Sequence, residues 1–510
     1  MTAADHFVRR LRRHGIDWMA GLCGHGLDPL FHAAKQAGLR IVDTRNEQTA
    51  AYIAEAAGRL SRRPGVCAVS SGVAVANALT GVVNAWFDGA PMLLVSGAAA
   101  TRTAGLGHFQ DLDQVSLARP VVKDSRSIDH AARTVQMLDE ALQIATAPQP
   151  GPVHLMFPMD VQTTEIAAEQ MIRSVPPAAS AETDDDPAEI ADALAESSRP
   201  LIVAGSGVYY AQTGPDLMQF SEACAIPVVT PIWDRGSIDR RLETFMSVIG
   251  AATGGPDLLQ DADCILLAGC ASDYRLGYLQ SGARTFRVTR AWRQLLERRR
   301  RQHTEWLEEA RARNERFRCG IEATAAKQAE AGTHASHIVS AMREVLPDEA
   351  AVLVDGGSVG QWFHQLFRDR YPGHWLTCGR SGVVGWGLGG AMAARLVFPD
   401  RPVVLLSGDG AFTFTVTEIE CAVRQNLPFV AVVADDQAWG ITQTGHVRQF
   451  GEPISSGLGP IAFDRLAGSL GAQGVVASHP EDIAPALKKA LQQRAVTVIH
   501  VPIVGGLPSA

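Results

Sequence analysis

The chain has 510 residues, too many for one hydrophobic core, so two to four domains are expected. Hydrophobic residues make up 46% and charged residues 20%, which is typical of a globular protein, and the net charge of −8 argues against a nucleic-acid partner. The sequence contains no stretch of the roughly 18 apolar residues that a membrane helix needs, and no apolar signal segment at its start. We therefore expect a cytoplasmic protein that binds neither nucleic acid nor membrane.

The first block of the chain, from residue 3 to about 165, alternates short apolar segments with amphipathic helical patterns. The expected strands are residues 17–21, 66–70, 92–96 and 153–157. This alternation predicts βαβ units and a parallel sheet. Residues 161–186 are polar and rich in Ala and Pro, and they end in three consecutive aspartates, which predicts a linker.

Two further blocks have the same character. The second contains apolar segments at residues 200–205 and 264–269, and the third starts near residue 334 with the segment 352–357. The predicted fold class is therefore α/β, with three doubly wound parallel-sheet domains at residues 1–165, 187–320 and 334–510. A basic stretch at residues 293–318 predicts a solvated helix face, because the chain as a whole is acidic.

The cysteines are scattered, with no Cys-x-x-Cys pair. We expect buried, reduced thiols rather than a disulfide framework or a zinc site. The eight residues are Cys23, Cys67, Cys224, Cys264, Cys270, Cys319, Cys378 and Cys421.

Two acidic residues follow apolar segments of the third block. Asp409 stands in Gly408-Asp409-Gly410 after residues 403–406, and Asp436 follows residues 429–433. These runs predict parallel strands, and doubly wound sheets bind ligands at the carboxyl ends of their strands. Two carboxylates beside glycines at such ends suit a hard cation such as Mg²⁺ that carries a phosphate.

The spacing between these two acids resembles the signature of thiamin-diphosphate-dependent enzymes. Independently, residues 45–51, 69–77 and 84–92 resemble the pyrimidine-binding half of the acetolactate synthase, benzoylformate decarboxylase and benzaldehyde lyase superfamily. The resemblance covers nearly the whole chain. It implies a pyrimidine-binding, a central and a diphosphate-binding domain, in that order.

The resemblance also implies a set of cofactor residues. Glu47 matches the glutamate that holds N1′ of the aminopyrimidine, and Asp409, Asp436 and the backbone carbonyl of Ala438 match the ligands of Mg²⁺. The other expected cofactor contacts are Ser358, Gly382, Val384, Gly408, Gly410, Ala411 and Trp439.

The sequence departs from the family pattern at three positions. Asp436 replaces the usual Asn, which adds a negative charge beside the expected cation. Val384, expected to bend the cofactor, is smaller than the usual residue, and Gly389 replaces a proline.

Two residues are expected to face the substrate. His25 lies in the glycine-rich loop after the first strand, and imidazole suits proton transfer near neutral pH. The alternative is a loop histidine with a purely structural hydrogen bond. By resemblance, Gln110 is the expected partner of the adduct oxygen or of a bound water, whereas the adjacent His108 has no counterpart in the family pattern.

The resemblance favours a carboligase or lyase that forms or cleaves a carbon–carbon bond next to a carbonyl. A 2-oxo acid decarboxylase without ligation is the first alternative, and a catalytically impaired cofactor-binding subunit is the second. Small-molecule carbonyl or 2-oxo acid substrates are expected, at sites on the interface of a homodimer or homotetramer. FAD is not expected, because Arg287 to Arg290 stand where some relatives carry an acid for an adenine ribose.

Overall fold

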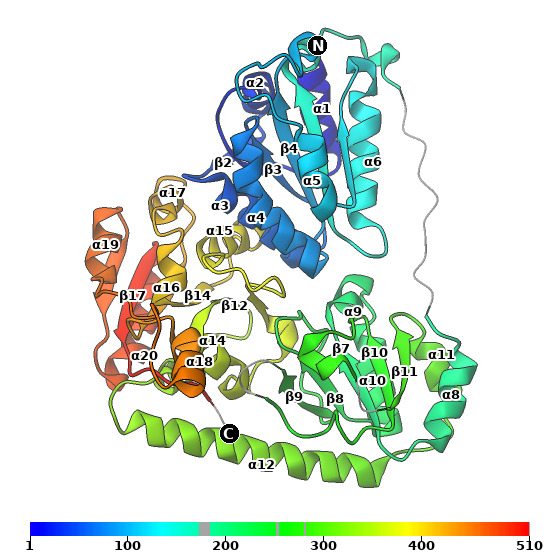
Figure 1. The fold of residues 1–510 in the computed structure, drawn as a ribbon, viewed down its shortest axis with the longest axis vertical. Coiled ribbons are helices and arrows are strands. Elements are labelled where there is room, and N and C mark those ends of the chain that lie inside the picture. Colours follow the sequence, from blue (N-terminus) through cyan, green and yellow to red (C-terminus); the bar gives the residue numbers. More distant parts are fainter. Residues whose placement is uncertain (173–183, 251–253, 280–281, 509–510) are drawn as a thin grey trace. The chain divides into compact units, whose positions relative to one another are not determined.

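The computed structural model describes residues 1–172, 184–250, 254–279 and 282–508 (Figure 1). Within these residues the strands form three parallel sheets of six, five and six strands. The predicted class, α/β with three parallel-sheet domains, is confirmed. Each sheet lies inside one of the predicted ranges, although the domain limits themselves stay predictions.

The first sheet has the strand order β2-β1-β3-β4-β6-β5. Its strands are β1 (Trp18–Leu22), β2 (Arg40–Asp43), β3 (Gly65–Val69), β4 (Met92–Ala98), β5 (Asp124–Ser127) and β6 (Pro152–Pro158). The helices of this part of the chain are α1 (Ala3–Arg13), α2 (Asp28–Gln36), α3 (Glu47–Ser61), α4 (Val73–Asp88), α5 (Gln114–Ala118), α6 (Thr134–Thr146) and α7 (Met159–Thr163).

The second sheet has the order β11-β10-β7-β8-β9. Its strands are β7 (Pro200–Ala204), β8 (Val228–Pro231), β9 (Phe245–Ile249), β10 (Cys264–Ala268) and β11 (Arg284–Val288). The accompanying helices are α8 (Pro187–Glu196), α9 (Ser206–Ala211), α10 (Gly214–Cys224), α11 (Trp292–Glu297) and α12 (Thr304–Ala329).

The third sheet has the order β13-β12-β14-β15-β17-β16, which is the order of the first sheet over again. Its strands are β12 (Ala351–Asp355), β13 (Trp375–Thr377), β14 (Val403–Gly408), β15 (Val430–Asp435), β16 (Gln473–Val476) and β17 (Thr497–Pro502). The helices are α13 (Ala335–Val345), α14 (Gly357–Leu366), α15 (Gly387–Val397), α16 (Asp409–Thr413), α17 (Glu418–Arg424), α18 (Gly440–Phe450), α19 (Phe463–Ser469) and α20 (Pro480–Gln493).

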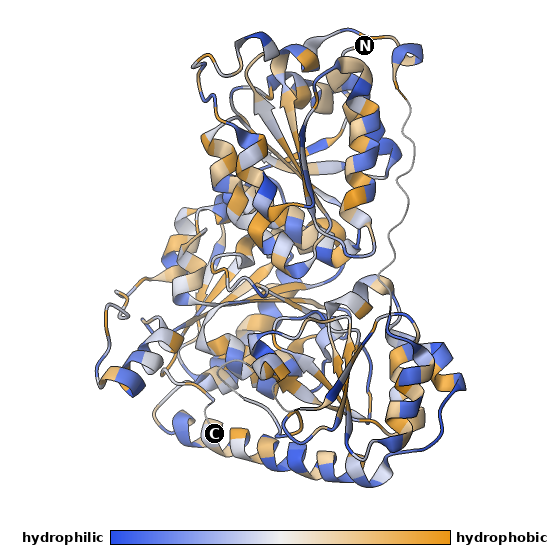
Figure 2. Ribbon diagram, turned by 45° about the vertical axis from the view of Figure 1, so that its right-hand side comes forward, coloured by the Kyte–Doolittle hydropathy of each residue, from blue (hydrophilic) through white to orange (hydrophobic). Residues whose placement is uncertain are grey.

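The inner strands are apolar along their whole length because helices cover both faces of a parallel sheet. In β4, β7, β10 and β14 every residue is buried, and Figure 2 shows the corresponding hydrophobic colour in the sheets. Surface helices such as α1 and α20 carry hydrophobic and hydrophilic residues on opposite sides, whereas α3 and α15 are buried along most of their length.

The chain forms two compact units. Unit 1 contains Met1–Ala181, Gly379–Asp400 and Thr415–Pro428, and unit 2 contains Glu182–Cys378, Arg401–Phe414 and Phe429–Ala510. Helices α15 and α17 therefore belong to the unit of the first sheet, where α15 packs on α3, although in the sequence they lie between strands of the third sheet.

Several details of the sequence-based expectation are wrong. Cys23 and Cys319 are exposed, one on the loop after β1 and the other on the outer side of α12, although all eight cysteines are free thiols as predicted. The basic stretch forms two helices, α11 and α12, rather than one. Residues 298–303 between them are not helical, and the His303 backbone nitrogen donates to the Cys224 carbonyl at 2.9 Å.

The expected linker is also partly wrong. Its start belongs to α7, and its last aspartates are hydrogen-bonded to the second sheet: the carboxylate of Asp185 accepts from the Arg287 N–H at 2.7 Å. Residues 173–183 lie outside the described residues. In the described part of the chain no helix is long and apolar enough to cross a membrane.

Candidate active site

The strand order places a crevice in unit 1 at the carboxyl ends of β1 and β3. The chain runs from β1 to β2 in one direction across the sheet and from β3 onward in the other, and ligands bind at such a reversal. Loops after β1, β3 and β4 carry His25, Ser71 and Gln110 to this edge. The sequence-predicted substrate-facing residues are therefore brought together.

Glu47 begins helix α3, which follows β2 at the same edge of the sheet. The helix is capped by Asn46, whose side chain accepts from the Gln48 N–H at 2.8 Å, so the helix start is fixed. Glu47 is half-buried, and its Oε2 accepts from Asn77 Nδ2 at 3.0 Å. One carboxylate oxygen is thus oriented by α4, and the role of Glu47 toward a cofactor stays a prediction.

The loop of His25 is seated on the turn after β3. Its carbonyl accepts from the Ser70 hydroxyl at 2.7 Å, and the Ser71 hydroxyl donates to Gln110 Oε1 at 3.0 Å. Gln110 has φ +56°, and a Cβ on Gly72 would lie 2.7 Å from the Gln110 carbonyl oxygen. Gly72 therefore allows the two loops to approach each other.

In unit 2 the equivalent reversal lies between β12 and β14. Asp409 directly follows β14 and Asp436 directly follows β15, its neighbour in the sheet, with Gly408 paired to Ala434. The expected placement of both acids at adjacent strand ends is confirmed. Ser358, in the first turn of α14 after β12, reaches the same place and donates to Asp436 Oδ2 at 3.3 Å.

The electrostatics of this edge favour a cation. Burial raises the pKa of Asp409 to about 7, and the nearby carboxylates of Asp436 and Asp435 add to the rise. Burial also raises the pKa of Asp436, against the hydrogen bond from Ser358. The described residues hold no group of three acidic, His or Cys side chains arranged for a metal, so a cation here needs backbone carbonyl and phosphate oxygens as well.

Glycines bring the backbone of this edge close to the two acids. A Cβ on Gly440 would lie 2.6 Å from Asp436 Oδ2, and one on Gly410 would lie 2.6 Å from the Trp439 ring. Ala411 and Ala438 are buried beside them. Gly408, Gly410, Ala411, Ala438 and Trp439 are thus brought together with the two acids, whereas Glu47 lies in the other unit.

Gly382 and Val384 lie in unit 1, on the loop before α15. Helix α4 holds this loop: Asp88 Oδ1 accepts from the Arg380 N–H at 3.0 Å, and Asn84 Oδ1 accepts from the Ser381 hydroxyl at 2.5 Å. Gly382 has φ +70°, which favours glycine, and Val384 is half-buried. Their roles as cofactor contacts stay predictions.

A buried charged network continues from this loop. Glu55 of α3 is fully buried, accepts from the Trp386 indole N–H at 2.7 Å, and lies 3.1 Å from the Arg59 guanidinium. Burial raises the pKa of Glu55 to about 7, although Arg59 opposes the rise. Arg59 also reaches Asp88 at 3.5 Å, so the network connects α3, α4 and the segment that carries Gly382.

Sequence reasoning missed the polar residues of α4. Asn77, Asn84 and Asp88 stand seven and four residues apart in a helix that is otherwise mostly apolar, so they share one face. This spacing can be recognised in the sequence and predicts a polar face on α4. In the structure, that face holds Glu47 and the loop of Gly382.

In the second sheet the strand order reverses between β7 and β10. The loops that follow these two strands are in direct backbone contact. The Gly207 N–H donates to the Gly269 carbonyl at 2.8 Å, and a Cβ on Gly207 would lie 2.7 Å from Gly269 Cα. After β11, the Asp184 carboxylate accepts from the N–H groups of Thr289, Arg290 and Ala291 at 2.7 to 2.8 Å. Donors that suit a phosphate are thus bonded to the chain's own carboxylate.

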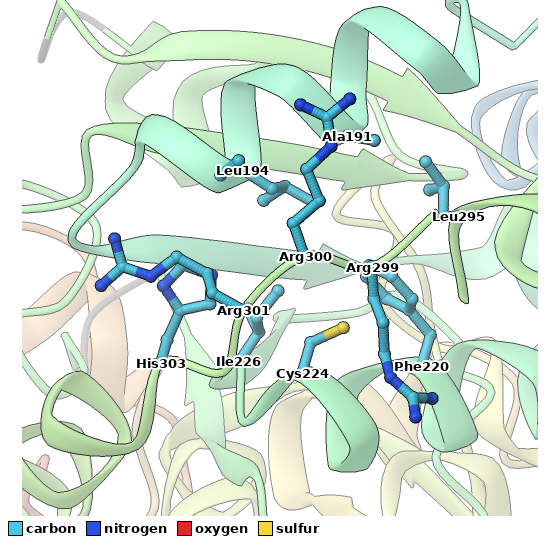
Figure 3. A pocket seen from close by; sticks show the side chains of 11 residues that line it. Ala191, Leu194, Phe220, Cys224, Ile226, Leu295, Arg299, Arg300, Arg301 and His303 are labelled. Carbon is cyan, nitrogen blue, oxygen red and sulfur yellow. The ribbon is translucent and has the colours of Figure 1, made fainter. Parts of the chain in front are cut away.

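A pocket elsewhere in this domain lacks the converging polar groups of an active site. It is a space of about 280 Å³, open solvent included, between α8, α10, α11 and residues 299–303. Its floor is apolar, with Leu194, Phe220 and Ile226, and Figure 3 shows the guanidinium groups of Arg299, Arg300 and Arg301 directed away from one another. Binding sites instead have a few polar groups that converge.

Three family models match the chain in sequence order. Residues 1–117 match the N-terminal TPP binding domain of thiamine pyrophosphate enzymes, residues 187–288 match the central domain, and residues 355–501 match the C-terminal TPP binding domain. The first match spans strands β1 to β4 of the first sheet, the second spans the whole second sheet, and the third runs from the end of β12 into β17 of the third sheet.

Similar proteins extend over nearly the whole chain. 2-Hydroxyacyl-CoA lyase 2 of Homo sapiens is 30% identical over 95% of this chain and 86% of its own length. An acetolactate synthase large subunit of Mycobacterium tuberculosis is 29% identical over 98% of this chain and 95% of its own length. Acetolactate synthase isozyme 1 large subunit of Escherichia coli is 24% identical over 98% and 94%.

The raised pKa of Glu55 predicts a pH dependence of stability that Glu55→Gln removes. The native state binds the Glu55 proton more tightly than the unfolded state, so stability is greatest below the unfolded value of 4.5 and falls as pH rises toward about 7. The wild type should lose on the order of 2 kcal/mol relative to Glu55→Gln between pH 5 and pH 8.

Urea unfolding of both proteins at several pH values measures this difference. Glu169→Gln is the matched control, because Glu169 is exposed and should leave the pH dependence as in the wild type. Parallel curves for the wild type and Glu55→Gln would mean that Glu55 is ionised throughout this range.

Proposed function

We propose that this chain, a member of the thiamin-diphosphate-dependent enzymes that form or cleave a carbon–carbon bond next to a carbonyl, acts on compounds with a hydroxyl group on the carbon beside that carbonyl. Both acetolactate and 2-hydroxyacyl-CoA, after which its relatives are named, have this arrangement. One observation supports it most directly: an imidazole and a carboxamide, from His25 and Gln110, lie at the same sheet edge as Glu47. These groups can move a proton at a hydroxyl oxygen and stabilise charge on it.

Bound thiamin diphosphate would supply an electron sink for the negative charge that develops on the carbonyl carbon when the adjacent carbon–carbon bond breaks. The chain's own residues do the remaining work. Glu47, oriented by Asn77, is proposed to hold a proton at N1′ of the aminopyrimidine. Gly382 offers its backbone carbonyl to the 4′-amino group, and Val384 supports the ring contact.

The diphosphate end is proposed to bind at the strand ends of unit 2. Asp409, Asp436 and the carbonyl of Ala438 would hold Mg²⁺. The raised pKa of Asp409 means that its carboxylate is costly to bury without a positive charge nearby. A cation would supply that charge, which supports the proposal. Gly408, Gly410, Ala411 and the Ser358 hydroxyl would face the phosphates, and Trp439 packs on Gly410.

At the substrate end His25 is the proposed proton carrier. In the cleavage direction it takes the proton from the hydroxyl oxygen as the carbon–carbon bond breaks and a carbonyl forms, and in ligation it returns that proton. Gln110 donates its amide hydrogens to the same oxygen or to a water.

No nucleotide is expected in the central domain. Asp184 accepts hydrogen bonds from backbone N–H groups after β11, and Asp185 accepts one from Arg287 within β11; this supports the expectation that FAD does not bind there. A carboxylate already in that position repels a phosphate.

Activity assays with Glu47→Gln test the proposed reaction. Enzyme supplied with thiamin diphosphate and Mg²⁺ is incubated with a 2-hydroxyacyl-CoA, with pyruvate alone, and with pyruvate plus an aldehyde. We expect aldehyde release from the first or a hydroxyketone from the last, and a loss of about 10²-fold or more in Glu47→Gln with cofactor binding kept, as for a lost proton-transfer group.

Carbon dioxide release from pyruvate without any ligated product would favour the decarboxylase alternative. Full activity of Glu47→Gln would contradict the role of Glu47. Glu169→Gln serves as the control for removal of a surface carboxylate.

Asp409→Ala should weaken Mg²⁺-dependent binding of thiamin diphosphate by at least about tenfold, because a metal ligand is lost. Titration calorimetry with and without Mg²⁺ measures this, and circular dichroism checks the fold. Glu349→Ala removes an exposed carboxylate of the same domain and should bind normally. An unchanged affinity in Asp409→Ala would refute the metal assignment.

We further propose that two copies share each site, with Glu47 of one copy and Asp409 of the other. An isologous dimer would then contain two equivalent sites. Mixing inactive Glu47→Gln and Asp409→Ala chains should restore about one competent site per heterodimer, since the second site collects both defects. Activity is measured after refolding the mixture, with native mass spectrometry to count heterodimers; heterodimers without activity would exclude shared sites.

A further inference from the structure

The ring of His108 stacks on the ring of His25. Their centroids lie 5.4 Å apart with an angle of 21° between the planes, and Phe109 meets His25 edge-on at 5.6 Å. The two histidines come from different loops, after β1 and after β4. The imidazole of His25 is therefore confined by two rings of the segment that also carries Gln110.

This arrangement is held by backbone contacts rather than by the rings alone. The Ser71 N–H lies 3.3 Å from the His25 carbonyl, while the Ser71 hydroxyl donates to Gln110. Asp111 accepts from the Gly105 N–H at 2.7 Å and from the Gly107 N–H at 3.3 Å, which closes the turn that presents His108. The hydrogen bonds of the two loops therefore hold the rings of His25 and His108 in their stacked arrangement.

The ring nitrogens of the two histidines have different environments. His25 Nε2 is buried and has no hydrogen-bond partner among the described residues. His108 Nδ1 lies 3.1 Å from the Phe109 carbonyl, which can only accept, so Nδ1 carries the hydrogen and Nε2 is the nitrogen that gains or loses a proton. Both rings can become charged, and like charges at this separation repel.

Few other charged groups belong to the segments around His25. Its own loop carries Cys23 and Asp28, and the 104–113 loop carries His108, Asp111 and Asp113. The turn at Ser70 to Gly72 and the first turn of α4 have none, and Glu47, at the start of α3 on the same sheet edge, accepts a hydrogen bond from Asn77. His108 is the group whose ring contacts His25, so its charge has the most direct effect.

We infer that His108 is a positioning residue for His25: its stacked ring fixes the orientation of the imidazole that is proposed to accept a proton from the substrate hydroxyl, and a charge on one ring disfavours a charge on the other. The half-exposed His108 lies next to strongly exposed Leu106 and Phe109, so solvent reaches it. The inference rests on the proposed role of His25 in proton transfer.

Two substitutions separate orientation from charge. His108→Phe keeps a ring that can stack but removes the charge, and His108→Ala removes both. His32→Asn is the control, because His32 is exposed and no hydrogen bond or ring contact involves it among the described residues. Thermal midpoints and thiamin diphosphate affinity should equal those of the wild type in all three.

The titration of His25 is followed by NMR of protein with ¹³C-labelled histidine rings, with the His25 signal assigned by its loss in His25→Gln. In His108→Phe the midpoint of the His25 titration should move to higher pH by about one half to one unit, because the repelling charge is gone. A midpoint within about 0.2 unit of the wild type would overturn the inference.

The pH dependence of kcat/KM gives the second measurement. In His108→Phe the acid limb should move to higher pH with kcat at the optimum within about threefold of the wild type, whereas His108→Ala should also lose about tenfold or more in kcat. Equal profiles for the wild type and His108→Phe would contradict the coupling.

The NMR result does not depend on the reaction. If the His25 midpoint moves but no substrate is turned over, the proposed function fails and the coupling stands. If activity is found but neither the midpoint nor the profile moves, the function stands and the role of His108 is wrong.

Discussion

Three aspartates lie close together at the ends of β14 and β15, and the arrangement of the third domain around them must limit the repulsion between their carboxylates. Asp409, Asp435 and Asp436 come within a few residues of two adjacent strand ends, in a place where burial disfavours ionisation. His500 Nε2 donates to Asp435 Oδ2 at 2.7 Å, which stabilises one of the three carboxylates. The other two carboxylates lie beside glycine backbone, and the proposed divalent cation would relieve their repulsion.

In unit 1, helix α4 positions the predicted site residues. Its apolar residues bury it against α3, while Asn77, Asn84 and Asp88 form one polar face. That face orients Glu47 and holds the loop of Gly382. Because one rigid helix holds both, small shifts of α4 would displace them together. The buried Glu55 and Arg59 on α3 continue the same network to Trp386.

The sequence was most informative where function requires special residues in a fixed order. The Gly-Asp-Gly turn, the later Asp436 and the start of α3 at Glu47 could all be placed at strand or helix ends, and the fold class followed from the alternation of strands and helices. The edge strands β2 and β5 were missed because they are short and polar, as edge strands often are. Contacts between distant segments, such as Asp184 with residues 289–291 or His108 with His25, leave no periodic pattern and could not be predicted.

Structure also accounts for two of the three departures from the family pattern. A Cβ on Gly389 would lie 2.8 Å from the Cβ of Tyr52, so glycine at this position permits the close contact of α15 with α3. The extra charge of Asp436 is met by the hydroxyl of Ser358, and Gly440 leaves room for its carboxylate. Val384 has no such explanation in its surroundings. The departures that can be explained are adjustments of packing and charge around the predicted site residues, which argues for a working enzyme rather than an impaired subunit.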